Sequence, residues 1–366
     1  MPLPPTRRAA LLAALPAFAH AQSPSLHQVD LFERGFAGVH TYRIPALIET
    51  RQGALLAVAD ARHDNGDDLP GRISLVLRKS TDFGRTWTPQ STLVQVPRGG
   101  AGDASLLLDR QGRVWCFYAY GAPGIGFRTA KPGPLTGPDV LQVHAIVSTD
   151  GGSSWSRPTD LTPQIRDPRW HAVFATSGTH FVTARGRMIV PLVILDENKA
   201  ITTRNAWSDD DGRTWKTGPA VAPETDESKA VEIAGGVVLQ NVRNGPARLV
   251  ARSTDGGITF HDARHHESLN DAGCNAGFAR YRHGGRDLLL FTNAASTRRE
   301  NLTIRASADA GRTWPAARVI HPGPAAYSTV LPLRDGSIAV LYERGDASPY
   351  ERITFARLSP DWLPAP

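Results

Sequence analysis

The sequence predicts an all-β protein, a six-bladed β-propeller with Asp-box turns, and two repeats lead to this prediction. One is an eight-residue motif, written STDFGRTW from Ser80, that returns four more times in variant form. The other is a hairpin of two strand-like runs around a tight glycine turn, which occurs six times. The intervals between copies are too irregular for a tight solenoid and suit propeller blades with loops of variable length. We therefore expect residues 22–366 to form a single propeller domain.

Residues 1–21 have the composition of an export signal. A basic start is followed by an apolar run from Ala9 to Phe18 and by small residues before Gln22. We expect this segment to be removed and the remaining chain to be secreted or periplasmic. Its paired arginines would suit a twin-arginine route as well as the general one, and an apolar first strand is the alternative interpretation.

The eight-residue motif has the chemistry of a turn. Its Asp side chain can accept hydrogen bonds from backbone amides two residues on, and the Gly that follows tolerates positive φ. Each copy comes after a strand-like run and lacks the further carboxylates that calcium loops collect, so we interpret it as a structural clasp rather than a calcium site. The Asp residues of the five copies, called Asp boxes below, are Asp82, Asp150, Asp210, Asp255 and Asp309.

The six hairpins predict the inner strands of the blades. Five are followed by an Asp box, and the sixth by ITFARLSPDWL. The early segment HQVDLFERG, from His27, is expected to lend a strand that closes the ring, because a closed ring leaves no exposed sheet edge. The turn glycines are Gly53, Gly112, Gly186, Gly236, Gly285 and Gly336.

Composition and charge favour a soluble globular protein. The chain is 41% apolar and 21% charged with a net charge of +6, and it contains no apolar run of the roughly 20 residues that span a membrane. The basic residues form no block typical of nucleic-acid binding, so we expect no nucleic-acid partner and a surface suited to acidic glycans. Cys116 and Cys274 are expected to be buried free thiols rather than one bridge, and no His or Cys lies at zinc spacing from either. No metal or cofactor is expected.

Hairpin geometry predicts where a functional pocket lies. The first strand of a hairpin starts where the second one ends, and the glycine turn lies at the opposite end. Residues about nine positions before or after each turn glycine therefore face one mouth of the ring. The Asp boxes lie on the other face. Arginines, carboxylates and a tyrosine occupy such positions. They are Arg43, Arg62, Asp103, Glu227, Arg243, Arg299, Tyr327 and Glu343, with Asp64, Asp67 and Asp68 just beyond Arg62.

Four segments resemble those of bacterial sialidases (exo-α-neuraminidases) when they are taken together with the five Asp boxes. They are YRIP from Tyr42, DESKAVEIAGGVVLQNVR from Asp226, RRENLTIRAS from Arg298 and AYSTVLPLRDGSIAVLYE from Ala326. The resemblance covers nearly the whole chain after residue 21. It implies a retaining exo-α-sialidase that acts on terminal sialic acids of glycoproteins, glycolipids and oligosaccharides without a cofactor, and we expect a monomer.

The resemblance also implies a clamp of three arginines, Arg43, Arg243 and Arg299, on the substrate carboxylate. Guanidinium groups suit this role because they bind carboxylates through paired, planar hydrogen bonds. Glu343 matches the acidic partner that orients the first arginine. Arg298 is the alternative to Arg299, which we prefer from its spacing to the following strand.

The catalytic residues implied by the resemblance are Tyr327 as nucleophile and Glu227 as its base, with Glu232 as a less favoured base. A phenol is a poor nucleophile near neutral pH, but a nearby carboxylate can take its proton during attack. A neutral nucleophile also avoids repulsion by the anionic substrate. A packed blade tyrosine is the alternative interpretation of Tyr327.

An aspartate in the segment ARHDNGDDLP is expected to be the acid/base residue. In the family that the chain resembles, the acid often precedes a small residue and Pro, so the resemblance implies Asp68, which precedes Leu-Pro, with Asp67 and then Asp64 as alternatives. Neighbouring carboxylates can raise the pKa of an acid and so favour a proton donor. Arg62 and Asp103 are expected to line the same pocket.

Two other functions stay open at this point. A trans-sialidase, or an enzyme specific for a deaminated sialic acid, could keep every one of these residues. A non-catalytic Asp-box propeller that serves as a binding module would keep the repeats but has no need for the tyrosine, the glutamate and the three arginines.

Overall fold

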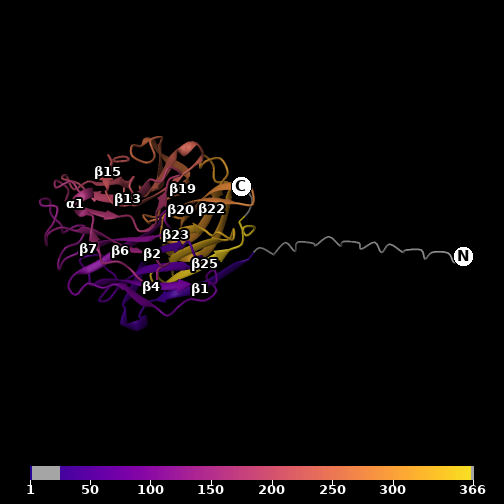
Figure 1. The fold of residues 1–366 in the computed structure, drawn as a ribbon, viewed down its shortest axis with the longest axis horizontal. Helices are drawn as coiled ribbons and strands as arrows, with labels where there is room; N and C mark the ends of the chain where they lie inside the picture. The colour runs from indigo at the N-terminus through magenta and orange to yellow at the C-terminus, as the bar shows by residue number, and fades with distance from the viewer. Residues whose placement is uncertain (2–24, 364–366) are drawn as a thin grey trace.

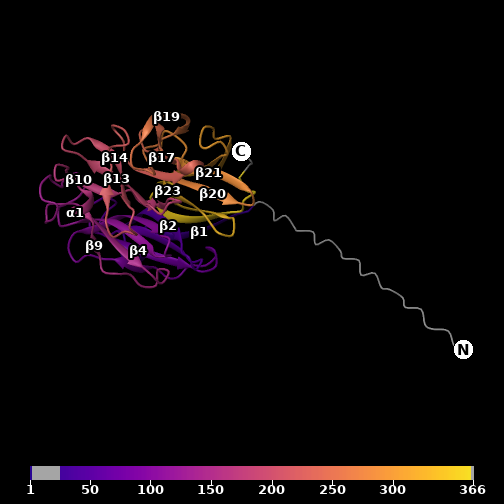
Figure 2. The same ribbon diagram turned by 45° about the horizontal axis from the view of Figure 1, so that its top comes forward.

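The computed structural model describes residue 1 and residues 25–363, and the predicted export signal lies almost entirely outside the described residues. Its strands form a ring of sheets in which the chain runs from indigo at the bottom of Figure 1, through magenta and orange, to yellow at the right. Strands β2 and β23 lie near the centre in both views, and β4 and α1 lie toward the outside (Figure 2). This arrangement confirms the predicted all-β propeller class.

The described residues form five sheets. The first contains β2 (Thr41–Glu49), β3 (Leu55–Arg62), β4 (Ile73–Ser80) and β5 (Ser91–Val94). The second contains β6 (Gly100–Leu108), β7 (Val114–Gly121), β8 (Gln142–Ser148), β9 (Thr159–Asp160) and β11 (Gly178–Thr179). The third contains β10 (Ala172–Ala175), β12 (Phe181–Val182), β13 (Met188–Leu195), β14 (Ile201–Ser208) and β15 (Lys216–Thr217). The fourth contains β16 (Ser228–Glu232), β17 (Val238–Val242), β18 (Ala247–Ser253) and β19 (His261–Asn270).

The fifth sheet joins the two ends of the propeller. It contains β20 (Gly277–His283), β21 (Arg286–Ala294), β22 (Glu300–Ser307), β23 (Ala316–Pro332), β24 (Ile338–Arg344), β25 (Arg352–Leu358) and β1 (Leu26–Glu33). The first part of β23 pairs with β22 and its last part with β24, so one long strand is the outer strand of one blade and the inner strand of the next. Strand β1 pairs antiparallel with β25, which confirms that the early segment closes the ring. The short helices are η1 (Phe36–Gly38), α1 (Thr162–Ile165) and η2 (Ala234–Gly236).

The Asp boxes are clasps at the ends of strands. In the first box, the Asp82 carboxylate accepts hydrogen bonds from Ser80 Oγ, from the Thr86 amide and from Thr86 Oγ1, at 2.6–2.9 Å. These bonds, above all those from Thr86, lower the pKa of Asp82 to about 2. The closing Trp87 folds back to donate from Nε1 to the Gly84 carbonyl, and its ring lies 5.1 Å from that of Phe355. The box therefore also packs one blade against its neighbour.

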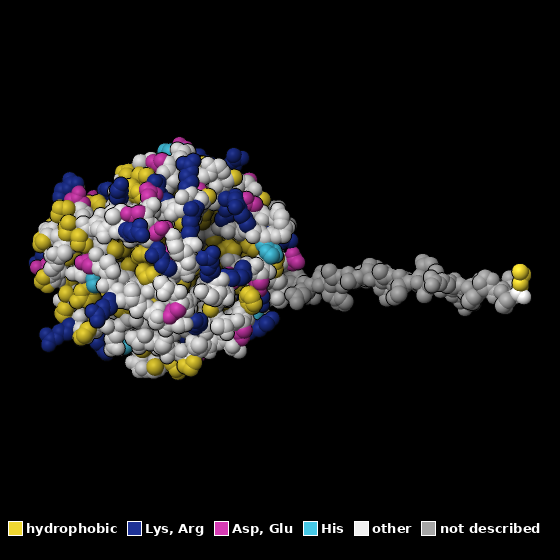
Figure 3. Space-filling model, in the orientation of Figure 1, with side chains coloured by type: hydrophobic (Ala, Val, Ile, Leu, Met, Phe, Trp, Pro, Cys, Tyr) yellow, Lys and Arg dark blue, Asp and Glu magenta, His cyan; other side chains and the backbone are white. Residues whose placement is uncertain are grey.

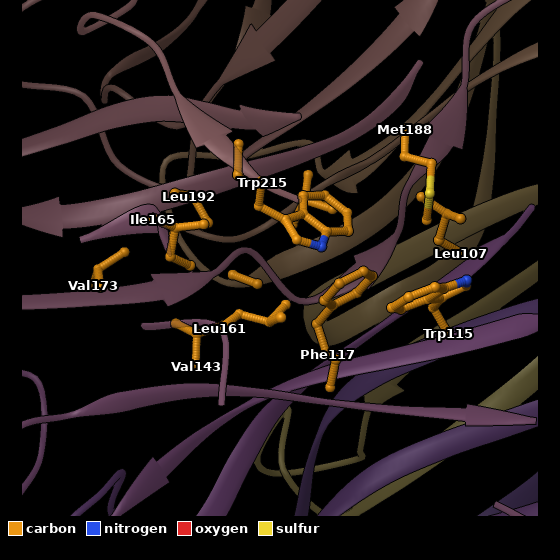
Figure 4. Packing of buried hydrophobic residues seen from close by; sticks show 14 of the residues in the cluster. Leu107, Trp115, Phe117, Val143, Leu161, Ile165, Val173, Met188, Leu192 and Trp215 are labelled. Carbon is orange, nitrogen blue, oxygen red and sulfur yellow. The ribbon is translucent and has the colours of Figure 1, made fainter. Parts of the chain in front are cut away.

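The hydrophobic core lies between adjacent blades. Figure 4 shows one cluster in which Trp115 and Phe117 of β7 pack against Trp215, the closing Trp of the third Asp box. The centroid of the Trp215 ring lies 6.2 Å from that of the Trp115 ring and 5.5 Å from that of the Phe117 ring. Burying a side chain such as Phe117 contributes about 1.5–3 kcal/mol. Both cysteines are buried and free, as the sequence predicted.

The surface carries charge of both signs. On the face shown in Figure 3, Lys and Arg side chains are dispersed among Asp and Glu, and hydrophobic side chains lie in a hollow near the centre. Among residues 25–363, no helix is long and apolar enough to cross a membrane.

Candidate active site

A pocket of about 210 Å³ opens at the starting ends of the inner strands. Asp103, Glu227 and Tyr327 line it together with Asp68 and Arg243, and with Phe174 of β10 residues in or next to strands of all five sheets meet there. Its other walls are mainly apolar. They are Ile44, Leu69, Phe127, Leu141, Phe174 and Ile201, with Arg128 and Asp226.

Irregular pairing at this end of three inner strands aims their side chains into the pocket. The register shifts between Arg43 and Ala46 in β2, and Ile44 there has a φ of 63°. Similar shifts occur in β6, where Asp103 has a φ of 57°, and in β23 before Ser328. Positive φ is costly for an Ile, and such strained bulges are typical of functional sites, where they redirect a side chain. Sequence periodicity gave no sign of these bulges.

Glu343 fixes the backbone and side chain of Arg43. Its carboxylate, which is fully buried, accepts hydrogen bonds from Arg43 Nε at 2.7 Å, from the Ile44 amide at 2.8 Å and from the Tyr327 amide at 3.1 Å. Burial, the largest single effect, lowers the pKa of Arg43, but the charge and hydrogen bond of Glu343, together with Tyr327 and Tyr350, raise it overall. One carboxylate therefore ties the start of β2 to β23 and keeps Arg43 charged.

Tyr327, Glu227 and Arg243 form a tight cluster on the pocket floor. Tyr327 Oη donates to Glu227 Oε2 at 2.6 Å, and Arg243 Nη1 lies 2.8 Å from that same oxygen and 3.2 Å from Tyr327 Oη. Burial raises the pKa of Glu227, and burial together with the charge of Glu227 raises the pKa of Tyr327 well above its ordinary value. The phenol is therefore neutral and donates its hydrogen bond to a carboxylate whose pKa is raised.

Arg299 points to the same tyrosine from the neighbouring blade. Its Nη1 donates to Tyr350 Oη at 2.5 Å and its Nη2 to the Gly273 carbonyl at 2.7 Å, and its Cζ lies 5.7 Å from the Tyr327 ring centre. Arg298 instead has a side chain that is 79% exposed and pairs with Glu300. The structure thus brings Arg299, and not Arg298, to the cluster.

Tyr350 is a site residue that the sequence reasoning missed. Its ring centre lies 4.2 Å from Arg43 Cζ and its hydroxyl accepts from Arg299, so it contacts both guanidinium groups. Such cation–π contact stabilises a cation that has left water. A signal existed, because Tyr350 follows Gly336 at the same interval at which Arg299 follows Gly285.

The loop after β3 carries Asp68 to the pocket. Arg62, which is buried, donates from Nη2 to Asp68 Oδ1 at 2.6 Å and from Nη1 to the Gly66 carbonyl at 2.6 Å. The Asp68 side chain is 78% exposed and lines the pocket. Asp64 pairs with Arg72 at 2.6 Å on the surface, and Asp67 is exposed and outside the pocket lining.

A further buried acid, Asp60, lies behind this loop and was also missed. Its carboxylate accepts hydrogen bonds from the Asp103 amide at 3.1 and 3.3 Å and lies 3.7 Å from Arg62 Nη2. Burial raises the pKa of Asp60 to about 7, although Arg62 opposes the shift. Burial and the charge of Asp60 likewise raise the pKa of Asp103. Asp60 could have been found as the residue two before Arg62, on the same side of the strand.

Glu232, the less favoured base, lies far along β16 from the cluster. It pairs with Val238 next to the glycine turn, and its Oε2 accepts from the Ala184 amide at 2.6 Å.

Within residues 25–363 no group of three or more His, Cys, Asp or Glu side chains could hold a metal ion. Arg43, Arg243 and Arg299 surround Tyr327, and this arrangement suits an anionic ligand.

The fold and this site define a propeller with an arginine-lined pocket, in which Arg128 and Arg243 line the walls while Arg43 and Arg299 lie beside the Tyr327 ring. The model of the BNR repeat-like domain matches residues 53–340, and the chain belongs to that family. It is 39% identical over 358 residues to a sialidase of Micromonospora viridifaciens, covering 92% of this chain and 55% of the relative. It is 31% identical over 328 residues to a sialidase of Bacteroides fragilis, covering 82% of this chain and 60% of the relative.

A solved structure supports the same relationship. The chain superposes on a Hadza microbial sialidase with a TM-score of 0.82 at 28% identity, covering 89% of this chain and 66% of the other. The resemblance to bacterial sialidases is thereby confirmed. The chain spans only a little over half the length of the curated relatives described above.

Proposed function

We propose that the chain is a retaining exo-α-sialidase that hydrolyses terminal α-linked sialic acids from glycoproteins, glycolipids and oligosaccharides. The contact of Tyr327 Oη with Glu227 Oε2 at 2.6 Å, among three arginines, carries this proposal. An isolated structural tyrosine would need neither a buried base nor three cations beside it. The sialidases that the chain resembles support the same activity.

The arginines bind the sialic acid carboxylate. Arg43, Arg243 and Arg299 approach the Tyr327 ring from three blades, and their mutual repulsion falls when an anion enters between them. This binding places the anomeric carbon, which carries the carboxylate, over Tyr327 Oη. The substrate is then oriented by its charge before any bond changes.

Asp68 and Tyr327 divide the chemistry between them. Asp68 protonates the leaving oxygen while Tyr327 Oη attacks the anomeric carbon and gives its proton to Glu227. Because burial raises the pKa of Glu227, this carboxylate accepts the proton more readily than an exposed one would. Water, activated by Asp68, then hydrolyses the tyrosyl glycoside, so two inversions give net retention. We further propose that the enzyme acts as a monomer outside the cytoplasm after removal of residues 1–21.

A fluorogenic α-sialoside tests the reaction, with the chain from Gln22 onward assayed at about pH 5 to 7, the range in which carboxyl acid/base pairs work. Tyr327→Phe is expected to lose release of the fluorophore and Asp68→Ala to lose most of it, while Asp67→Ala, the matched control, keeps it. Equal losses in the two Asp variants would contradict the assignment of Asp68.

Trapping and product analysis test the mechanism. A 3-fluorosialyl fluoride should label the proteolytic peptide that contains Tyr327, and NMR should show the α-anomer as the first product. An intramolecular transfer product would instead indicate a trans-sialidase. Activity confined to a deaminated substrate would identify that specificity, and a folded protein inactive on both would favour a binding module.

A further inference from the structure

A second pocket, of about 390 Å³, lies at the opposite end of the inner strands from the candidate active site. Its walls come from the last residues of β16 and β23, from β20 along most of its length, and from the segment that contains β11 and β12. On β16 the two pockets are separated along the strand, since Glu227 precedes its first residue and Glu232 is its last. The volume lies within the range of about 300–1,000 Å³ that is typical of small-molecule sites.

Hydrophobic side chains dominate the walls of this second pocket. Val231 and Phe278 are buried, and Phe181 and Leu331 are half-buried with part of their surface facing the opening. Exposed apolar surface in a concave site is a source of binding energy, because a ligand that covers it releases water.

An unpaired imidazole lies among these apolar walls. His180 is 5% exposed and lines the pocket, and neither its Nδ1 nor its Nε2 has a hydrogen-bond partner among the described residues. Its backbone amide donates to the Leu106 carbonyl at 2.8 Å, which holds the residue in place. A buried polar group without a partner costs free energy, so an occupant able to pair with it is favoured.

His180 offers an occupant an uncharged hydrogen-bonding partner. Burial and the nearby charge of Lys229 hold the pKa of His180 well below its ordinary value, so the ring is neutral. Lys229 Nζ already donates to Asn275 Oδ1 at 2.7 Å, and Arg280 is paired with Asp287 at 2.5 Å. Arg282 has a side chain that is 64% exposed and lies at the opening with Glu232.

We propose that this pocket binds a small hydrophobic molecule that carries one uncharged hydroxyl group. The hydroxyl pairs with a ring nitrogen of His180, and the apolar body packs against Val231, Phe278 and Phe181. This site does not depend on the proposed sialidase activity, because the residues that form it are separate from the arginine-lined pocket.

Three probes of one shape test the chemistry of the ligand. These are 4-ethylphenol, ethylbenzene without the hydroxyl, and 4-ethylbenzoate with a charge, each titrated into the chain from Gln22 onward and followed by saturation-transfer NMR and calorimetry. Saturable binding of 4-ethylphenol is expected, with at least tenfold weaker binding of the other two. No saturable binding of the phenol, or equal binding of all three, would overturn the proposal.

Variants locate the binding. His180→Leu is expected to weaken 4-ethylphenol at least tenfold, and Ala279→Trp, which fills the opening, to abolish binding. His27→Leu on the exposed strand β1 and Tyr327→Phe in the other pocket are expected to leave it unchanged. Loss of 4-ethylphenol binding in Tyr327→Phe would place the probe in the arginine-lined pocket and refute the assignment. Unchanged binding in Ala279→Trp would also refute it, and this variant tests the site even if His180→Leu fails to fold.

Discussion

Replacing Glu343 by Gln removes one charge from the centre of the candidate site while keeping the size of the side chain. The carboxylate accepts three hydrogen bonds, two at Oε1 and one at Oε2, and it is the ion-pair partner of Arg43. A glutamine oxygen can keep the bonds to Arg43 Nε and to the Ile44 amide. Its NH₂ group then faces the Tyr327 amide, so two donors meet and one stays unpaired.

The expected loss of stability follows from burial. Glu343 is fully buried and Arg43 is 7% exposed, so water cannot replace the lost partner. Breaking a buried ion pair on one side costs about 3–5 kcal/mol, of which an unpaired amide alone accounts for about 1–3 kcal/mol. Because Arg43 then faces a neutral partner in place of a charged one and is held less firmly, KM for an α-sialoside should rise more than kcat falls.

Equilibrium urea unfolding, followed by tryptophan fluorescence, measures this loss. Asp64→Asn is the matched control, because it breaks an Arg–Asp pair that is as short, at 2.6 Å, but lies on the surface. We expect the control to unfold close to the wild type. A loss below about 1 kcal/mol in Glu343→Gln, or an equal loss in the control, would refute the reasoning from burial.

Three further predictions concern pH, packing and the choice of arginine. Folding raises the pKa of Asp60 from 3.8 to about 7, so the contribution of Asp60 to stability is greatest below about pH 4 and is lost as pH rises through about 7. Asp60→Asn should therefore flatten the dependence of the unfolding free energy on pH between these two values, and an unchanged slope would contradict this. Gly84→Ala and Gly124→Ala both place a Cβ at a φ of 84°, but only at Gly84 does the new atom overlap a buried aromatic ring, that of Phe355. Gly84→Ala should therefore be less stable than Gly124→Ala by about 1–3 kcal/mol in thermal or urea unfolding. Arg299→Ala should raise KM for an α-sialoside at least tenfold and Arg298→Ala should not, and the reverse result in steady-state kinetics would move the clamp to Arg298.

Most of the architecture could be predicted because its signals are local. The Asp box closes on itself through Ser80, Asp82 and Thr86, within one turn, so eight residues suffice to specify it. The glycine turns likewise fix the two ends of each hairpin, and from the ends alone the sequence placed Arg43, Asp103, Glu227 and Tyr327 at one mouth. The contact of Trp87 with Phe355, which lies far away in the sequence, was not predicted, because no local pattern indicates which blade packs against the Asp box.

The sequence alone specified the propeller, the polarity of its inner strands and the residue types gathered at one mouth, because turn chemistry and alternation act over a few residues. The fold decided which side chains point inward. The bulge at Ile44 turns Arg43 toward Glu343, 300 positions away, and the loop after β3 presents Asp68 but not Asp67. It also placed Tyr350 against Arg43 and Arg299, and Asp60 beside Arg62. These outcomes depend on contacts between blades that are remote in the chain, and only the closed ring brings those partners together.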